Sequence, residues 1–508
     1  MEYIIVQAGG KGTRLGYLTK NKPKALVPVN NLPMIFHLFQ KYPDKKFIVI
    51  ADYHKEVIRE YLACFAKIKY LIVDADGTGT CSGIRQALEF VPLNQAFMLV
   101  WSDLILPDEL KFPEEFQKSE TEINADSIQK QDYIGISRTF SCRWSYQNNR
   151  FIEVPSAEHG VAGFFLFHDK SKLLSVPSSG ELVRWMQSEE MEFKEISLAG
   201  TKEFGILEEY EAFSREKCRP FNRITIEGDR LTKEAIDDQG RKLAIRECAW
   251  YEKAKENQVK VLPQIYSTNP LTMEYIKGKN IYECQLAYCE KKIILEKLIC
   301  ALRELHNVGS IEADPFSIKE AYYHKTMKRL SKVENLIPFA REKVIRVNGR
   351  NCRNVFFYQH ELEKKIEQIS CNRFYFIHGD CTFSNLMLRE DGSPVLIDPR
   401  GYFGFTQIYG DIRYDWAKLY YSILGNYDQF NLKKFRLDIE NNEVSLKIES
   451  NHWEDMENDF FQLIGEDISE IKLLHAVIWL SLTTYAWQDY DSICGAFYNG
   501  LYYLEEAL

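Results

Sequence analysis

Short, continuous apolar runs recur through the first part of the chain. Residues 3–6, 46–50, 69–73 and 97–103 consist mainly of aliphatic and aromatic side chains. Runs of this kind, without alternation, are typical of strands buried on both faces. Between the second and third runs, residues 55–65 are largely polar and predict a helix. The alternation of strands with a helix favours an α/β domain with a largely parallel sheet.

One further segment extends this pattern. Residues 84–90 follow a glycine-rich stretch and predict a helix. Residues 135–147 mix polar with aromatic side chains, so this segment is either a flap over a site or a surface hairpin. Residues 207–217 predict a helix that closes the domain.

The second part of the chain has a different pattern. Residues 224–233 alternate polar and apolar side chains as a strand does. Residues 243–255 and 291–306 predict helices, the second ending at His306, which we expect to be structural. Residues 317–368 are rich in charge and predict further helices.

The chain is too long for one hydrophobic core, because it has 508 residues. We expect two domains, at residues 1–217 and 218–508, with a linker beginning at Arg219-Pro220.

Composition excludes several classes of protein. Hydrophobic residues make up 45% and charged residues 27%, as in an ordinary globular protein. The net charge of −9 argues against nucleic acid or an anionic membrane as a partner. The 12 cysteines are scattered, as is typical of reduced thiols. No apolar run is long enough to cross a bilayer, and the first residues are not typical of a signal peptide. We therefore expect a cytoplasmic protein.

A glycine-rich loop follows the first predicted strand and reads Gly9-Gly10-Lys11-Gly12-Thr13-Arg14-Leu15. Its glycines allow the backbone to approach a triphosphate and turn N–H groups toward it, and Lys11 and Arg14 add positive charge. A second element follows at Pro23-Lys24-Ala25-Leu26-Val27-Pro28. Together the two elements resemble the signature of sugar-1-phosphate nucleotidyltransferases. These are Rossmann-like enzymes that join a nucleoside triphosphate (NTP) to a sugar phosphate and release pyrophosphate.

The resemblance implies roles for individual residues of the first domain. Lys24 and Arg14 would be catalytic, and Asp103 would hold Mg²⁺. The family's second metal carboxylate falls at Glu203, where this chain has Glu in place of Asp and Ile206 in place of Thr. Nucleotide contacts are implied for Ala8, Gly9, Gly10, Gly12, Thr13, Gly79 and Thr80.

The acceptor of this first domain stays open. Sugar-specific members often carry Glu-Lys-Pro before the acceptor-lining strand, but this chain has Glu153-Val154-Pro155. Residues 160–167 resemble the acceptor-lining strand that follows, with Gly163 as a substrate contact. Either a sugar phosphate or a small amino-alcohol phosphate fits this pattern.

A second constellation lies in the second domain. An apolar run ends in His378-Gly379-Asp380, Asn385 follows, and a second apolar run ends in Asp398. Phosphoryl transfer from ATP needs such a set, because one Asp accepts the substrate's proton while an Asn and another Asp hold Mg²⁺. The segments resemble those of the aminoglycoside phosphotransferase and choline kinase families. That resemblance assigns Asp380 as the base, with Asn385 and Asp398 on magnesium.

The same resemblance implies an α+β, protein-kinase-like fold for the second domain, with a small lobe at residues 218–280 and a large lobe at residues 281–508. Lys233 would contact the ATP phosphates, and Glu247 would be its ion-pair partner. Residues 271–278 resemble the hinge strand. Backbone groups there would meet the adenine at Glu274 and Ile276.

Arg400 follows Asp398 closely and has two interpretations. Near the transferred phosphate it would favour a neutral or anionic substrate over a quaternary amine. Alternatively it pairs with Asp411 or Asp415. The aromatic side chains of residues 473–503 are similarly open, because they either form a wall for choline or belong to the helix core.

The two signatures describe consecutive reactions. We therefore expect a Mg²⁺-dependent bifunctional enzyme whose second domain phosphorylates a small hydroxyl substrate, first of all a sugar, with ATP. The first domain would then transfer a nucleotidyl group from an NTP to that phosphate. The family resemblance implies a product that feeds bacterial surface polysaccharide, as in capsule or lipopolysaccharide. The alternatives are a choline or amino-alcohol kinase fused to a CTP-dependent cytidylyltransferase, and a first domain that senses nucleotides without catalysis.

Overall fold

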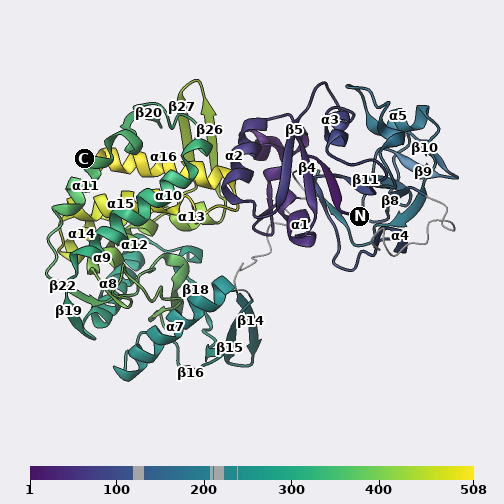
Figure 1. The fold of residues 1–508 in the computed structure, drawn as a ribbon. Helices are drawn as coiled ribbons and strands as arrows, with labels where there is room; N and C mark the ends of the chain where they lie inside the picture. The colour runs from purple at the N-terminus through teal and green to yellow at the C-terminus, as the bar shows by residue number, and fades with distance from the viewer. Residues whose placement is uncertain (118–130, 206, 208–209, 211–221, 237) are drawn as a thin grey trace. The chain divides into compact units, whose positions relative to one another are not determined.

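The computed structural model of this chain divides into two compact units (Figure 1). The residues it describes are 1–117, 131–205, 207, 210, 222–236 and 238–508. The first unit comprises Met1–Cys218 with Gln488–Tyr490, and the second comprises Arg219–Trp487 with Asp491–Leu508. Ile206, the predicted linker at Arg219-Pro220 and most of the helix predicted over residues 207–217 lie outside the described residues.

The first unit is built on a mixed sheet around β1 (Tyr3–Gln7). The parallel neighbours of β1 are β4 (Lys46–Ala51) and β6 (Phe97–Trp101), and β5 (Lys69–Asp74) extends the sheet beyond β4. On the other side, β11 (Gly160–Phe167) runs antiparallel to β6. The apolar side chains at the centre of β1 are fully buried. All five strand predictions are therefore confirmed. Strands with neighbours on both sides, such as β1 and β6, read as continuous apolar runs, whereas β5 stands at the end of the strand order and is only partly buried.

The helices of this unit follow the strands in chain order. Those predicted at residues 55–65 and 84–90 are confirmed as α2 (Lys55–Phe65) and α3 (Ile84–Glu89). The remaining helices and strands used below are α1 (Met34–Lys41), α5 (Leu182–Ser188), β7 (Leu104–Ile105), β8 (Tyr133–Ser137), β9 (Ser145–Gln147), β10 (Arg150–Ile152), β12 (Lys194–Ser197) and β13 (Lys202–Glu203).

The segment at residues 135–147 is neither a flap nor a surface hairpin. It contributes to β8 and β9 of the main sheet, and its side chains Trp144 and Tyr146 belong to the core. Trp144 is 3% exposed and Tyr146 is fully buried. The Tyr146 hydroxyl donates to the carbonyl of Phe193 and accepts from its N–H, which satisfies the buried polar group.

The second unit begins with an antiparallel sheet in the order β14-β15-β17-β16. Its strands are β14 (Asn222–Glu227), β15 (Arg230–Ala235), β17 (Leu271–Glu274) and β16 (Ile265–Thr268). The helix predicted at residues 243–255 is confirmed within α7 (Asp238–Glu256), which packs against this sheet (Figure 1).

The single strand predicted at residues 224–233 is a hairpin. The chain turns at Gly228-Asp229, where Gly228 has a φ of 63°. Glycine adopts this left-handed conformation readily, so the chain can turn here. The alternation of polar and apolar side chains continues along both strands of the hairpin.

The rest of the second unit is mainly helical. The helix predicted over residues 291–306 is confirmed as part of α8 (Tyr288–His306). The region at residues 317–368 also contains the hairpin of β20 (Val344–Val347) and β21 (Arg350–Arg353), so the prediction of helices alone was incomplete. The other helices that bear on the site are α10 (Lys325–Val333), α12 (Ile412–Ile423), α13 (Tyr427–Asn431) and α15 (Ile468–Leu482). Among the described residues, no helix combines the length and apolarity needed to span a membrane.

Short strands position the loops that carry the predicted catalytic and metal-binding residues of this unit. β22 (Arg373–Phe376) leads into the His378-Gly379-Asp380 segment. The hairpin of β23 (Leu386–Arg389) and β24 (Pro394–Leu396) separates Asn385 from Asp398. Asn385 and Asp398 therefore flank the open end of one hairpin.

Two candidate active sites

The first unit has a pocket of about 750 Å³ at the carboxyl ends of its parallel strands. This is where open α/β sheets bind ligands. Gln7 at the end of β1 and Trp101 at the end of β6 both line it. Of the residues predicted to contact the nucleotide, those that line the pocket are Gly9, Gly10, Gly12, Thr13, Gly79 and Thr80. Ala8 does not line it, because its side chain is buried and its N–H donates to the carbonyl of Ile50.

The two predicted catalytic residues, Arg14 and Lys24, line this pocket as well. Gly12, two residues before Arg14, is in the left-handed region, with a φ of 61°. A Cβ at this position would lie 3.1 Å from the Cβ of Lys24, so glycine lets the loop pass close to the lysine.

Asp103 also lines this pocket, and its carboxylate contacts Lys24. Its Oδ2 accepts from the ammonium of Lys24 at 2.5 Å. Its Oδ1 is buried without a hydrogen-bond partner among the described residues. A buried carboxylate oxygen without a donor fits a hard cation, so Asp103 could hold Mg²⁺.

Glu203 lies beside Asp103 but does not line the pocket. In the pairing of β13 with β7, Glu203 is opposite Leu104, the residue after Asp103. Burial, together with these two carboxylates, raises the pKa of the nearby Cys142 thiol to about 12. The sheet register therefore brings Glu203 and Asp103 to neighbouring positions, while the role of Glu203 at a metal stays a prediction.

Gly163 does not line the pocket either. It lies at an irregularity of β11 with a φ of 74°, and a Cβ there would lie 2.0 Å from the ring of Trp101. Gly163 thus supports the tryptophan that lines the pocket.

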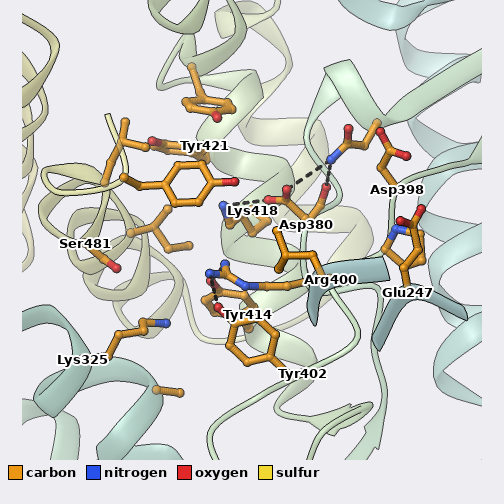
Figure 2. Close-up of a pocket in the computed structure, with 18 of the residues that line it drawn as sticks. Glu247, Lys325, Asp380, Asp398, Arg400, Tyr402, Tyr414, Lys418, Tyr421 and Ser481 are labelled. Carbon is orange, nitrogen blue, oxygen red and sulfur yellow. Dashed lines mark hydrogen bonds and ion pairs between the residues drawn. The ribbon is translucent and has the colours of Figure 1, made fainter. Parts of the chain in front are cut away.

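The second unit has a pocket of about 260 Å³ (Figure 2). The predicted residues that line it are Lys233, Glu247, Asp380, Asn385, Asp398 and Arg400. These residues come from β15, α7 and the two loops around the β23–β24 hairpin, so the fold brings together groups that are far apart in the sequence.

Lys233 joins two of these carboxylates. Its ammonium lies 2.8 Å from Glu247 and 2.9 Å from Asp398. Burial alone would lower the pKa of Lys233, but Asp398 and Glu247 outweigh it and raise the pKa above its usual value. The lysine is therefore a fixed positive charge at one end of the pocket.

Asp380 lies farther along the pocket and forms an ion pair with Lys418 at 2.9 Å. Burial tends to raise the pKa of Asp380, but Lys418 and Arg400 more than offset this and hold it below its usual range. Asn385 donates from its amide nitrogen to the carboxylate and the carbonyl of Asp380. This leaves the amide oxygen of Asn385 as an acceptor, which with Asp398 gives oxygen ligands suited to Mg²⁺.

The loop before Asp380 is held by Asp415, whose contribution the sequence did not indicate. The fully buried carboxylate of Asp415 accepts from the N–H groups of His378 and Gly379 at 2.9 and 2.7 Å. It also lies 3.0 Å from His306, which agrees with the structural role expected of that histidine.

Arg400 pairs with neither Asp411 nor Asp415, so that interpretation was wrong. Its guanidinium donates to the hydroxyls of Tyr414 and Tyr402 at 2.9 and 2.8 Å. Asp411 is instead occupied by Arg413, and Asp415 by the loop described above.

Glu274 and Ile276, predicted to meet an adenine, are not among the residues that line this pocket. Arg389 donates to the carboxylate of Glu274, and the backbone N–H of Glu274 donates to the carbonyl of Gln264. The C-terminal aromatic residues divide between the two interpretations. Trp479 is fully buried, whereas Tyr485 is 51% exposed and lines the pocket.

The sequence did not point to other residues that line this pocket. The basic ones are Lys325 and Arg329 on α10 and Lys418 on α12. Tyrosines from several elements complete the wall, at positions 402, 414, 421, 427 and 485. No group of three or more His, Cys, Asp or Glu arranged to hold a metal ion occurs in the part of the chain that the structure describes.

Known proteins resemble the first unit in sequence. Residues 3–131 match the model of the nucleotidyl transferase family. The N-terminal part of the chain contains a nucleotidyl transferase domain. Bifunctional protein GlmU of Methanocaldococcus jannaschii is 31% identical over 135 residues, which are 26% of this chain and 31% of that protein. The D-glycero-alpha-D-manno-heptose 1-phosphate guanylyltransferase of Campylobacter jejuni is 38% identical over 101 residues, 19% of this chain and 45% of that protein. The matches thus span less than half of either relative.

Solved structures are similar to different shares of the chain. HddC from Yersinia pseudotuberculosis covers 42% of this chain and 97% of its own, with 18% identity and a TM-score of 0.34. Choline kinase LicA from Streptococcus pneumoniae covers 58% of this chain and 92% of its own, with 15% identity and a TM-score of 0.38.

Proposed function

We propose that this chain is a bifunctional enzyme that acts twice on one small molecule. The second unit phosphorylates a hydroxyl group with ATP, and the first unit transfers a nucleotidyl group from an NTP to the new phosphate. The observation that carries this proposal is the convergence of Lys233, Glu247, Asp380, Asn385 and Asp398 on one pocket. A kinase makes the phosphomonoester that a nucleotidyl transferase domain consumes, so the two units fit consecutive steps.

The phosphorylation step uses Asp380 as its base. Because its pKa is below the usual range, this carboxylate is ionised at neutral pH and can accept the proton of the substrate hydroxyl. The oxygen then attacks the γ-phosphorus of ATP, and ADP leaves. Lys233 binds the phosphates of ATP, and Asn385 and Asp398 would hold Mg²⁺, which neutralises the phosphate charge.

The transfer step takes place in the pocket of the first unit. An oxygen of the acceptor phosphate attacks the α-phosphorus of the NTP, and pyrophosphate leaves. Lys24 and Arg14 place positive charge where the transition state gains negative charge, and the loop at residues 9–13 contributes backbone N–H groups. Asp103 would hold Mg²⁺ beside Lys24, and Glu203 is the proposed second carboxylate.

For the acceptor we favour a sugar, and we assign the product to the supply of activated units for surface polysaccharide. Arg400 in the kinase pocket supports this choice over choline, which with CTP is the alternative. A first unit that only senses nucleotides is the remaining alternative. It would bind an NTP but release no pyrophosphate.

The test is a pyrophosphate-release screen of the intact chain with Mg²⁺. Each NTP is combined with sugar 1-phosphates, phosphocholine and phosphoethanolamine, and a single strong pair identifies the nucleotide and the acceptor. The dephosphorylated form of that acceptor is then tested as a substrate for ATP-dependent phosphorylation. Nucleotide binding without pyrophosphate release for any pair would favour the sensor.

Two variants separate the units. Lys24→Ala should abolish pyrophosphate release and retain ATP consumption. Asp380→Ala should retain pyrophosphate release and lower ATP consumption by about a hundredfold or more. Circular dichroism checks that each variant is folded. If either folded variant lost both activities, independent sites would be the wrong description.

A further inference from the structure

One wall of the kinase pocket is made of basic side chains. Lys325, Arg329, Arg400 and Lys418 all line it. Lys418 forms an ion pair with Asp380. For the other three, the described residues include no carboxylate within ion-pair distance.

The hydrogen-bond partners of Arg329 and Arg400 are neutral groups. Arg329 donates to the carbonyl and the hydroxyl of Ser481 at 2.6 and 3.0 Å. Arg400 donates to two tyrosine hydroxyls, as described above. Hydroxyl and carbonyl groups satisfy N–H donors but do not neutralise a charge, so the pocket keeps an excess of positive charge.

The pKa values of Lys325 and Arg329 reflect this crowding. Burial and the nearby Arg400, Arg329 and Lys418 hold the pKa of Lys325 well below its usual value, and Glu320 offsets this only in part. Burial and Arg400 also lower the pKa of Arg329. Positive charges in this wall therefore repel one another, and a bound anion would relieve that repulsion.

These cations already lie over four of the tyrosine rings that line the pocket. The ammonium of Lys418 lies 5.3 Å from the ring centre of Tyr421 and 5.9 Å from that of Tyr427. Arg400 lies 4.8 Å from Tyr402. Lys325 likewise lies over the ring of Tyr414, at 5.7 Å. A quaternary ammonium needs such aromatic faces and would meet like charge at these four rings.

The basic wall lies away from the nucleotide end. In Figure 2, Lys325 and Ser481 lie on the opposite side of the pocket from Glu247 and Asp398, and Asp380 lies between. Because Lys233 marks the end for the ATP phosphates, the basic wall is on the side of the phosphoryl acceptor.

We propose that the phosphoryl acceptor is a small hydroxy compound that carries its own anionic group, a carboxylate or a phosphate. Its anion would lie among Lys325, Arg329 and Arg400, and its hydroxyl would face Asp380. The inference rests on the kinase function proposed above. The hydroxyl gives its proton to Asp380, its oxygen forms the new bond to the γ-phosphorus, the bond from that phosphorus to the bridging oxygen breaks, and ADP leaves.

The first experiment compares matched acceptors with the full-length chain, ATP and Mg²⁺. Glycerol is set against glycerate and glycerol phosphate, glucose against glucuronate and glucose phosphate, and choline is the cationic member. We expect kcat/KM for an anionic member to exceed that of its uncharged partner by about tenfold or more, the value of one charge-assisted hydrogen bond. Comparison of the carboxylate-bearing acceptors with the phosphate-bearing ones identifies which anion the site prefers. Equal or better turnover of the uncharged partners or of choline would overturn the inference and leave the kinase function standing.

The second experiment measures binding without catalysis. Inorganic phosphate is titrated by calorimetry into the full-length chain saturated with a non-hydrolysable ATP analogue. Lys325→Met and Arg329→Met should weaken phosphate binding by about tenfold, with recovery in Arg329→Lys. Lys328→Met is the matched control, because Lys328 is an exposed residue of the same helix. Absence of phosphate binding, or equal binding in Lys325→Met and Lys328→Met, would overturn the inference. If phosphate binds as expected but no acceptor is phosphorylated, the kinase function fails and the anion site stands.

Discussion

Gly163→Ala tests how closely the sheet of the first unit supports its pocket. An alanine at a φ of 74° costs about 1–2 kcal/mol, because its Cβ approaches the following carbonyl. The same Cβ would lie 2.0 Å from the ring of Trp101, so the ring must move, and such overpacking costs about 1–3 kcal/mol. We expect a total of about 2–5 kcal/mol, a large part of a typical domain's stability of about 5–15 kcal/mol.

Hydrogen exchange measured by mass spectrometry is the suitable assay, because a chain of two units need not unfold in one step. The amides of β1 report the opening of the first unit as a whole. Gly200→Ala is the matched control: Gly200 has a φ of 81°, and its Cβ would make only ordinary contact with Pro107, at 3.5 Å. The control should therefore show the backbone cost alone, about 1–2 kcal/mol.

The displaced ring also has a functional consequence. Trp101 lines the pocket together with Asp103, so pyrophosphate release by Gly163→Ala should fall while ATP consumption by the second unit stays unchanged. Equal exchange in the Gly163 and Gly200 variants would refute the argument, because it would mean that the ring accommodates the extra carbon at no cost.

Three further predictions concern the second unit. Asp415→Asn should lower kcat for phosphorylation by about a hundredfold and leave pyrophosphate release unchanged, because the carboxylate positions the loop before Asp380. Steady-state kinetics measures both activities, and an equal fall in both would contradict this positioning role. Lys418→Met should raise the pKa of Asp380, so the acid limb of the phosphorylation profile should move to higher pH, and an unmoved limb would contradict the ion pair's role. Anion binding should raise the lowered pKa of Lys325, so the protein should take up protons when it binds phosphate at alkaline pH. In calorimetry, the binding heat should therefore vary with the ionisation enthalpy of the buffer, and a heat that does not vary would exclude this.

The elements predicted best are those whose sequence pattern depends on burial alone. β1 and β6 could be recognised because strands enclosed on both faces tolerate few polar residues. The hairpin around Gly228 could not be recognised from alternation, because both arms of a hairpin keep the same period of two. Trp144 and Tyr146 were misjudged because a short run of polar and aromatic residues does not reveal which side of a sheet it covers.

The candidate sites divide in the same way. Asp380, Asn385 and Asp398 stand in compact motifs on short loops, so their proximity followed from their spacing, although their roles stay predictions. Lys325 and Lys418 stand on helices in charged segments. A lysine that faces a pocket has the same sequence pattern there as one that faces water, and only the packing of α10 and α12 against α15 decides between them.

The basic wall of the second unit's pocket has a consequence for the protein's lifetime. Repulsion among its cations makes the empty enzyme less stable than the occupied one, so any anion that fits would protect it from unfolding and proteolysis. A substitution that removes one of these charges would give a more stable but less active protein, which is the usual trade-off between stability and activity. The abundance of the enzyme in a cell would then follow the supply of its own substrate.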